Sequence, residues 1–191
     1  MDFKENGVIE LERELSELDK FVLDFVKVLE NHASYVIISG YVAILFGRTR
    51  TTEDVDMFIE RLDLTRAKQL YEDLLLHGFW ALNASSEEDF FSALSENIAV
   101  RFARKGVVIP NMEVKFVKDY LDKLTLENKV KVFTRGGIIC VSELALQIAY
   151  KRFVLKSEKD VEDAQHLQKW FNISEENVNK YRHILKEHGR I

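Results

Sequence analysis

The chain of 191 residues has very few of the residues that cross-link or interrupt a fold: one cysteine, one proline and eight glycines. The single cysteine, Cys140, excludes an internal disulfide and a cysteine-based metal cage, which favours a reducing compartment. It lies in an apolar run and is expected to be a small core residue. The scarcity of glycine and proline also excludes a flexible linker, and there is no repeat or low-complexity tract.

Long apolar runs are missing as well. No segment approaches the roughly 20 apolar residues that a bilayer-spanning helix needs. The first 18 residues lack the basic region followed by an apolar run that marks a signal peptide. These absences predict a cytoplasmic protein without a membrane partner.

The charges are balanced, with 27 Lys and Arg against 32 Asp and Glu, a formal net charge of -5. This mild acidity argues against nonspecific coating of nucleic acid, because such binding needs a strongly basic surface. Hydrophobic residues make up 47% of the chain and include 13 Phe, enough for a sizeable core. The length predicts one domain, or one domain with a small helical attachment.

Hydrophobic periodicity predicts a small mixed β-sheet with flanking helices and a helical C-terminal part, an α/β (α+β) class. The predicted strands are 35–38, 54–59, 98–104, 112–117, 130–133 and 137–141. The predicted helices are 11–29, 41–46, 64–76, 90–94 and 118–124, then a helical stretch from Ser142 as N-cap to Leu167, and a last helix capped by Ser174. The predicted division is 1–141, the first helix plus the sheet core, and 142–191, a helical region packed on it.

Two acids stand out because they fall on a predicted strand. Asp54 and Asp56 are two residues apart, so their carboxylates project from the same face of the strand. Like charges so close repel unless a cation lies between them, and Mg²⁺ prefers one or two carboxylates plus phosphate oxygens. A strand end near solvent is the alternative explanation.

A third acid follows from the same alternation. In residues 112–116 the apolar side chains share one face and leave Glu113 and Lys115 on the other. If this strand lies beside strand 54–59, Glu113 joins the aspartates. Three carboxylates around two ions would orient a nucleophile and stabilise a displaced phosphate. A solvent-facing strand residue is the simpler explanation for Glu113 taken alone.

The turn after strand 35–38 is a second candidate. Ser39 and Gly40 follow a buried strand and open a short helix, where backbone N–H groups and a hydroxyl can meet an anion. Arg48 and Arg50 flank the same loop and could hold phosphate by bidentate hydrogen bonds. A plain turn and ordinary surface charges are the alternatives.

Other chemistry finds little support in the sequence. The five histidines have no spacing suited to zinc. There is no glycine-rich dinucleotide fingerprint and no Walker-type loop. Trp80 and the pair Phe90 and Phe91 are expected to belong to the core and not to a base-stacking platform.

Taken together, residues 38–57, ISGYVAILFGRTRTTEDVDM, resemble the signature of the nucleotidyltransferase fold shared with DNA polymerase β. In that superfamily a turn of small residues and a short helix precede an Asp-x-Asp strand. The motif Gly-Arg-x-Arg-x-Thr-x-Asp at residues 47–54 resembles that of the minimal and AbiEii-type nucleotidyltransferases, which include toxins of toxin–antitoxin systems. The turn in this chain is Ser39-Gly40, whereas the family usually has Gly-Gly or Gly-Ser at this place.

The resemblance continues with LALQIAYK at 144–151 and KDVED at 159–163, and covers roughly residues 33–168. It implies Mg²⁺ ligands at Asp54 and Asp56 and a third acid on a later strand, which we assign to Glu113, although Asp is commoner there. By the same resemblance, Lys151 would contact nucleotide phosphates and Asp160 would orient that lysine or the acceptor. Lys156, Lys159, Asp160 and Asp163 lie at helical spacings that also allow plain surface ion pairs.

The leading hypothesis is a Mg²⁺-dependent nucleotidyltransferase that binds ATP or another NTP. It would use two ions to transfer a nucleoside monophosphate from the NTP to an acceptor hydroxyl. The acceptor is an RNA, a protein or a small molecule, and the resemblance adds an antitoxin-like protein partner. The alternative is a fold member that binds nucleotide, RNA or protein without catalysis. The first helix either forms a homodimer or covers the sheet, and covering it is favoured.

Overall fold

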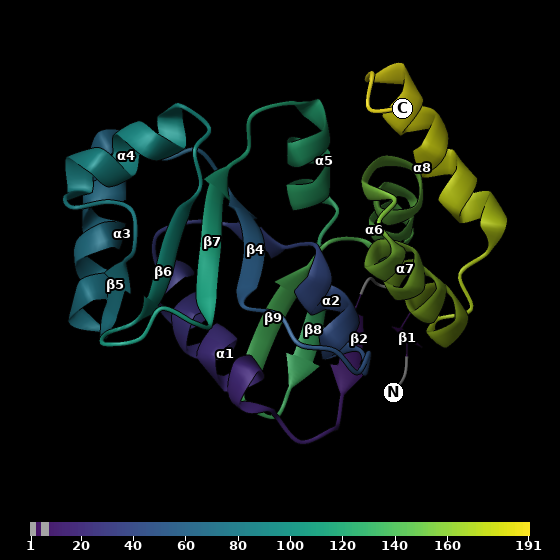
Figure 1. The fold of residues 1–191 in the computed structure, drawn as a ribbon, viewed down its shortest axis with the longest axis horizontal. Helices are drawn as coiled ribbons and strands as arrows, with labels where there is room; N and C mark the ends of the chain where they lie inside the picture. Colours follow the sequence, from purple (N-terminus) through teal and green to yellow (C-terminus); the bar gives the residue numbers. More distant parts are fainter. Residues whose placement is uncertain (1–2, 5–7) are drawn as a thin grey trace.

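The computed structural model describes residues 3–4 and 8–191 of the chain (Figure 1). Residues 1–2 and 5–7, which fall within the stretch considered for a signal peptide, lie outside the described residues. Within the described part, the chain forms one mixed sheet with helices around it.

The strands and helices have the following bounds. The strands are β1 (Phe3–Lys4), β2 (Val8–Leu11), β3 (Tyr35–Ile37), β4 (Asp54–Ile59), β5 (Phe79–Ala81), β6 (Val100–Arg104), β7 (Asn111–Phe116), β8 (Val130–Thr134) and β9 (Gly137–Val141). The helices are α1 (Glu17–Leu29), α2 (Gly40–Leu45), α3 (Leu64–Leu76), α4 (Glu87–Ser95), α5 (Tyr120–Glu127), α6 (Leu144–Tyr150), the π-helical segment η1 (Lys151–Leu155), α7 (Glu158–Trp170) and α8 (Glu175–Glu187).

The nine described strands lie in the order β1-β2-β8-β9-β3-β4-β7-β6-β5. The central pair β4 and β7 is parallel, and antiparallel strands flank it, β3 beside β4 and β6 beside β7. This confirms the predicted α/β class with a mixed sheet. It also confirms that strand 54–59 lies beside the strand that carries Glu113.

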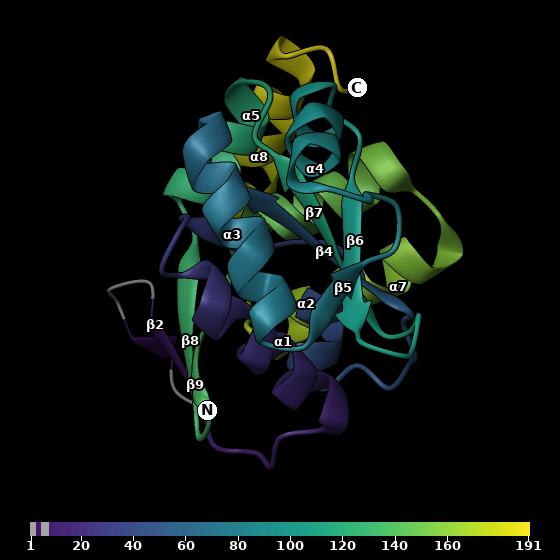
Figure 2. The same ribbon diagram turned by 90° about the vertical axis from the view of Figure 1, so that its left-hand side faces the viewer.

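The helices lie on different sides of the sheet. In Figure 1, α3 and α4 occupy the left of the molecule and α6, α7 and α8 the right, and in Figure 2 α3 and α4 lie in front of the C-terminal helices. The residues of β4 and β7 that alternate with the acids, such as Val55, Met57 and Val114, are buried in the core. The opposite face of these two strands is therefore the one that carries the polar side chains.

The predicted first helix began too early. Leu11 ends strand β2, and α1 starts at Glu17 because Ser16 caps it. The Ser16 hydroxyl accepts a hydrogen bond from the Asp19 backbone N–H at 3.2 Å, and the Asp19 carboxylate accepts one from the Ser16 backbone N–H at 2.7 Å. This reciprocal capping box fixes the start of the helix.

The helical stretch predicted from Ser142 to Leu167 is interrupted. Glu143, not Ser142, is the N-cap of α6, and the Ser142 hydroxyl donates instead to Gln147. After η1 the backbone turns left-handed at Lys156, with a φ of 60°, and Ser157 caps a new helix, α7. A left-handed residue cannot continue a helix, so the chain turns back on itself there.

Three further comparisons concern the core and the membrane. Cys140 and Phe90 are buried as predicted, but Trp80 is 37% exposed, and its ring N–H donates to the Val107 carbonyl at 2.8 Å. The short strand β5 that carries Trp80 lies at the sheet edge and was not predicted. Among the described residues, no helix combines the length and apolar character that crossing a bilayer requires.

Candidate functional site

The acids of β4 and β7 lie side by side on the sheet. The parallel register places Asp54 opposite Asn111 and Asp56 opposite Glu113. Because neighbouring strands in register point matching side chains to the same face, these four residues form one polar group. The side chain of Asp56 is 24% exposed and that of Glu113 is 11% exposed.

Two cations already contact Glu113. The Lys115 ammonium lies 2.5 Å from Glu113 Oε1 and 3.9 Å from Asp56 Oδ1. On the other side, Arg101 of β6 pairs with Glu113 in register, and its Nε donates to Oε2 at 3.2 Å. Each oxygen of Glu113 therefore has its own cationic partner.

The pKa values of Asp56 and Glu113 therefore shift in opposite directions. Burial raises the pKa of Asp56 above its ordinary value of 3.8, the negative charges of Glu113 and Asp54 add to this, and Lys115 and Ser39 only partly offset it. Burial also acts to raise the pKa of Glu113, but Lys115 and Arg101 outweigh it and lower that pKa below 4.5. The charge of Glu113 is thus well compensated, and that of Asp56 is compensated only in part.

The expected Mg²⁺ can be tested against these donors. No group of three or more His, Cys, Asp or Glu side chains in the described part of the chain is placed to hold a metal ion. However, the Asn111 side-chain oxygen, beside Asp54 in register, is buried and has no hydrogen-bond partner among the described residues. Two carboxylates and a free amide oxygen form the hard oxygen set that Mg²⁺ prefers, so Asp54, Asp56 and Asn111 fit the ion.

Ser39 holds an unusual backbone conformation beside Asp56. Its φ is 65° and its ψ is -138°, and such left-handed backbone costs a residue with a side chain about 1–3 kcal/mol. Gln147 of α6 holds this turn, because its Nε2 donates to the Ser39 carbonyl at 2.7 Å. A hydrogen bond between the Ser39 side chain and Asp56 acts to lower the Asp56 pKa.

The loop after α2 is tied to α7 by ion pairs. Arg50 donates to both oxygens of Asp163, at 3.1 and 3.0 Å, and Arg48 forms an ion pair with Glu162. The Arg50 guanidinium lies directly over Gly40, where a Cβ would come within 2.1 Å of its Nη2. In this structure the guanidinium groups of both arginines therefore form ion pairs that hold the loop against α7, and they are not available to bind an anion.

Lys151 is also paired. Its ammonium donates to Asp160 at 2.9 Å and to Asp163 at 3.0 Å, and its side chain is 1% exposed. Burial acts to raise the pKa of Asp160, but hydrogen bonds from Ser157 and Lys151 outweigh it and lower that pKa. Asp160 pairs with Lys151, and its orienting role stays a prediction; Asp163, which was not selected from the sequence, is the shared partner of Lys151 and Arg50.

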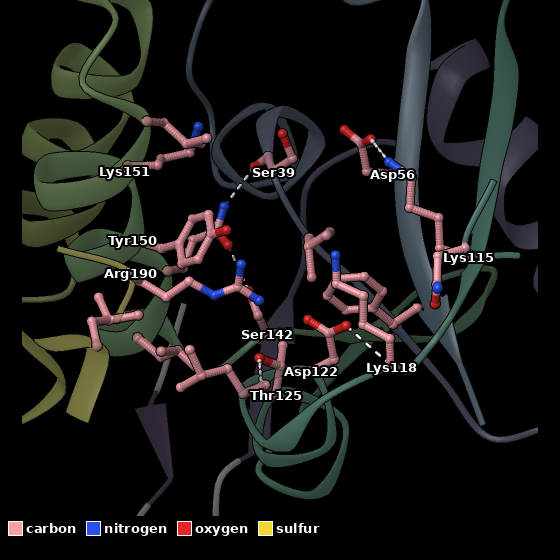
Figure 3. A pocket seen from close by; sticks show the side chains of 18 residues that line it. Ser39, Asp56, Lys115, Lys118, Asp122, Thr125, Ser142, Tyr150, Lys151 and Arg190 are labelled. Atoms are coloured by element: carbon pink, nitrogen blue, oxygen red, sulfur yellow. Dashed lines mark hydrogen bonds and ion pairs between the residues drawn. The ribbon is translucent and has the colours of Figure 1, made fainter. Parts of the chain in front are cut away.

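A cleft of about 320 Å³ opens between the polar face of the sheet and the C-terminal helices (Figure 3). Figure 3 shows Asp56 and Lys115 on the sheet side and Tyr150, Lys151 and Arg190 on the side of the C-terminal helices. Lys118, just before α5, and Asp122, in its first turn, close a third side. Four basic side chains line the cleft: Lys115, Lys118, Lys151 and Arg190.

The structure thus separates the predicted site residues into two groups. Ser39, Asp56 and Lys151 line the cleft, with Asp54 and Glu113 beside Asp56 on the sheet. Gly40, Arg48, Arg50 and Asp160 belong to the ion-paired junction between the loop after α2 and the helix α7. The sequence did not indicate Gln147, Lys118 or Arg190, which reach the cleft only through the packing of α5, α6 and the end of the chain.

Comparisons with known proteins give a match at the level of structure only. No protein-family model and no curated protein sequence matches the chain. The structure is similar to that of an antigenic nucleotidyltransferase-like protein from Paracoccidioides brasiliensis, with a TM-score of 0.50, 18% identity, and coverage of 91% of this chain and 90% of that one. It is also similar to the antibiotic-resistance factor ANT(2'')-Ia, with a TM-score of 0.54, 10% identity, and coverage of 91% and 94%.

Both similarities span nearly the whole length of each chain, and the sheet carries its Asp-x-Asp strand at the centre. The AbiEii-type subgroup suggested by the sequence remains a prediction. The chain has the nucleotidyltransferase fold.

Proposed function

We propose that this protein is a nucleotidyltransferase that binds an NTP in the cleft and transfers its nucleoside monophosphate to an acceptor hydroxyl, releasing pyrophosphate. One observation carries the proposal: Asp54 and Asp56 lie in register beside Asn111 and Glu113, and Asp56 lines a cleft that four basic side chains also line. Carboxylates beside lysines suit a substrate whose phosphates are bound partly through a metal ion and partly directly.

The roles follow from the positions of the side chains. Asp54 and Asp56, with Asn111, would hold Mg²⁺, which when bound supplies charge neutralisation at the phosphates and orients the attacking hydroxyl. Lys118 and Arg190 would contact the triphosphate as fixed positive charges. Ser39 would offer its hydroxyl at the turn beside Asp56, and Lys151 would form the inner wall of the cleft, held by Asp160 and Asp163.

Glu113 has a different role in this proposal from that of a freely available ligand. Both of its oxygens are paired, one with Lys115 and one with Arg101. It therefore positions Lys115 next to Asp56 and keeps the cationic groups of the sheet in place. The same pairing favours the second candidate, a nucleotidyltransferase-fold protein that binds nucleotide without transferring it.

The first prediction tests transfer. Purified protein is incubated with Mg²⁺, each of the four NTPs labelled at the α-phosphate, and total RNA, cell extract or small-molecule alcohols. We expect a labelled product and release of pyrophosphate, and we expect Asp54→Asn with Asp56→Asn to reduce the rate by at least about 10³-fold, because the charge that holds the metal is lost. Circular dichroism checks that the double variant is folded.

The outcomes separate the two candidates. Calorimetric binding of ATP and Mg²⁺ with no pyrophosphate release over long incubation would support the binding protein. Unchanged transfer by the double variant would contradict the proposed site, and a variant such as Glu162→Gln, whose acid lies outside the cleft, serves as the matched control.

A further inference from the structure

Side chains on the cleft face of the sheet form rows that run across neighbouring strands. The rows, from β4 through β7 to β6, are Asp54–Asn111–Ala103, Asp56–Glu113–Arg101 and Phe58–Lys115. The acids occupy the first two rows, and Lys115 lies one row further along the same strand as Glu113. The arrangement therefore has two ends with different charge.

At one end a lysine already lies between two carboxylates. The Lys115 ammonium reaches back along β7 to Glu113 Oε1 at 2.5 Å and stays 3.9 Å from Asp56 Oδ1 on β4. Glu113 Oε2 is taken by Arg101 Nε at 3.2 Å. Figure 3 shows the Lys115 ammonium beside the Asp56 carboxylate on the cleft wall. The space between these two strands thus contains a positive charge that belongs to the chain.

At the other end the oxygens are free. Within the described residues, the Asp54 carboxylate forms no hydrogen bond or ion pair, and the buried Asn111 oxygen has no partner. A divalent cation bound at this end meets oxygens alone. A second divalent cation between Asp56 and Glu113 would meet the ammonium of Lys115 at contact distance, where like charges repel strongly.

We propose that Lys115 takes the place of the second metal ion, so that the chain binds a single divalent cation at Asp54, Asp56 and Asn111. This inference rests on the proposed function and replaces the two ions expected from the sequence by one ion and one fixed lysine. Lysine suits this role because its ammonium is a compact point charge with three donors.

The test counts bound metal with Mn²⁺ as the probe. Calorimetry gives the number of ions per chain, and the Mn²⁺ electron paramagnetic resonance spectrum shows whether two ions lie close enough to broaden each other's signal. We expect one ion in the wild-type chain, with the ordinary six-line spectrum. In Lys115→Met we expect two ions and a broadened spectrum, because the vacated position then lies between Asp56 and Glu113.

Three controls sharpen the result. Lys118→Met removes a lysine from the same cleft that forms no ion pair with these acids, and should leave one ion. Lys115→Arg keeps a fixed positive charge and should also leave one ion, which separates loss of charge from disturbance of the strand. Asp54→Asn with Asp56→Asn should bind none.

Each outcome decides a different point. Two ions in the wild type, or one in a folded Lys115→Met, would overturn the role of Lys115 and leave the proposed function standing. No Mn²⁺ bound by the wild type, with or without a nonhydrolysable NTP, would overturn the metal site itself and with it the proposed function. The same number of ions in Lys115→Met and Lys118→Met would likewise overturn the inference.

Discussion

Asp56 shows at the scale of one residue how a candidate site can work against stability. Its carboxyl is partly buried beside Glu113 and Asp54, and the single ammonium of Lys115 is 3.9 Å away. Its pKa in the folded chain is therefore raised, and ionising it costs the fold free energy. A ligand that brings positive charge would recover that free energy when it binds.

This gives a prediction on the dependence of stability on pH. A carboxyl with a raised pKa contributes stability below its ordinary value of 3.8 and loses that contribution as the pH rises through the folded value. Asp56→Asn removes the ionisation, so at pH 7 the variant should unfold at a higher temperature than the wild type. The difference should shrink as the pH falls toward 3.8.

The measurement is thermal unfolding by circular dichroism between pH 3 and pH 8, without divalent ions. Asp24→Asn, which removes an exposed acid of α1, should not show the same pH-dependent gain. A lower unfolding temperature for Asp56→Asn at pH 7 would show that the Lys115 contact outweighs the burial of the charge.

At the scale of elements, the junction between the loop after α2 and the helix α7 depends on Asp163. Its side chain is fully buried and accepts hydrogen bonds from Arg50 and Lys151, which lie 101 residues apart in the sequence. The η1 segment carries Lys151, and the left-handed turn at Lys156 brings α7 back so that Asp160 and Asp163 face it. One carboxylate thus joins three segments of the chain.

Removing that carboxylate should be costly. Asp163→Asn leaves the buried Lys151 ammonium and the partly buried Arg50 guanidinium with less compensating charge, and breaking a buried pair typically costs about 3–5 kcal/mol. Urea unfolding should show this loss. Glu162→Gln, which changes a half-exposed acid on the same helix, should cost about 0–1 kcal/mol. Equal effects of the two substitutions would contradict the special role of Asp163.

The same elements show how far the sequence could predict the structure. Strand β4 and helix α3 have the predicted bounds, because an alternating run and a regular apolar stripe are local patterns. The neighbouring positions of Asp56 and Glu113 were predicted from alternation plus an assumed pairing of strands, and the register confirms that pairing. The local hydrophobic pattern was therefore sufficient to predict elements such as β4 and α3, in which one face is apolar and packs on the core.

Other features depend on partners that are distant in sequence. The periodicity of residues 144–167 reads as one helix, but Lys156 and the Ser157 cap break it so that Asp163 can reach Arg50. The short strand β5 depends on its pairing with β6. Arg48 and Arg50 look like phosphate ligands in the sequence because the acids that pair with them lie over 100 residues away.

At the scale of the whole molecule, the cleft is bounded by parts of the chain that meet across it. Gln147 of α6 donates to the Ser39 carbonyl on the sheet side. At the other end, Arg190 forms an ion pair with Asp119, and the ring of His188 stacks on Tyr120 at a centroid distance of 4.4 Å. These contacts tie the C-terminal helices to the turn after β3 and the end of the chain to α5, on two sides of the cleft.

Arg190 offers a test of this arrangement. It lines the cleft and is partly exposed, so Arg190→Gln should change the free energy of unfolding by no more than about 1 kcal/mol. Loss of its charge and of the contact with Asp119 should weaken binding of an NTP about tenfold, which calorimetry would measure. Lys186→Gln, an exposed change on α8, is the matched control, and equal affinity of both variants would contradict the role of Arg190.

The sharing of Asp163 has a consequence for how such sequences can diverge. Because one buried acid satisfies two bases from distant segments, no single substitution that removes a charge at position 50, 151 or 163 leaves the remaining charges balanced. Loss of one of these charges alone would pass through a destabilised chain, so in homologous chains the three charges should be retained together or lost together. Co-variation of positions 50, 151 and 163 would therefore identify chains that share this junction even where overall identity is low.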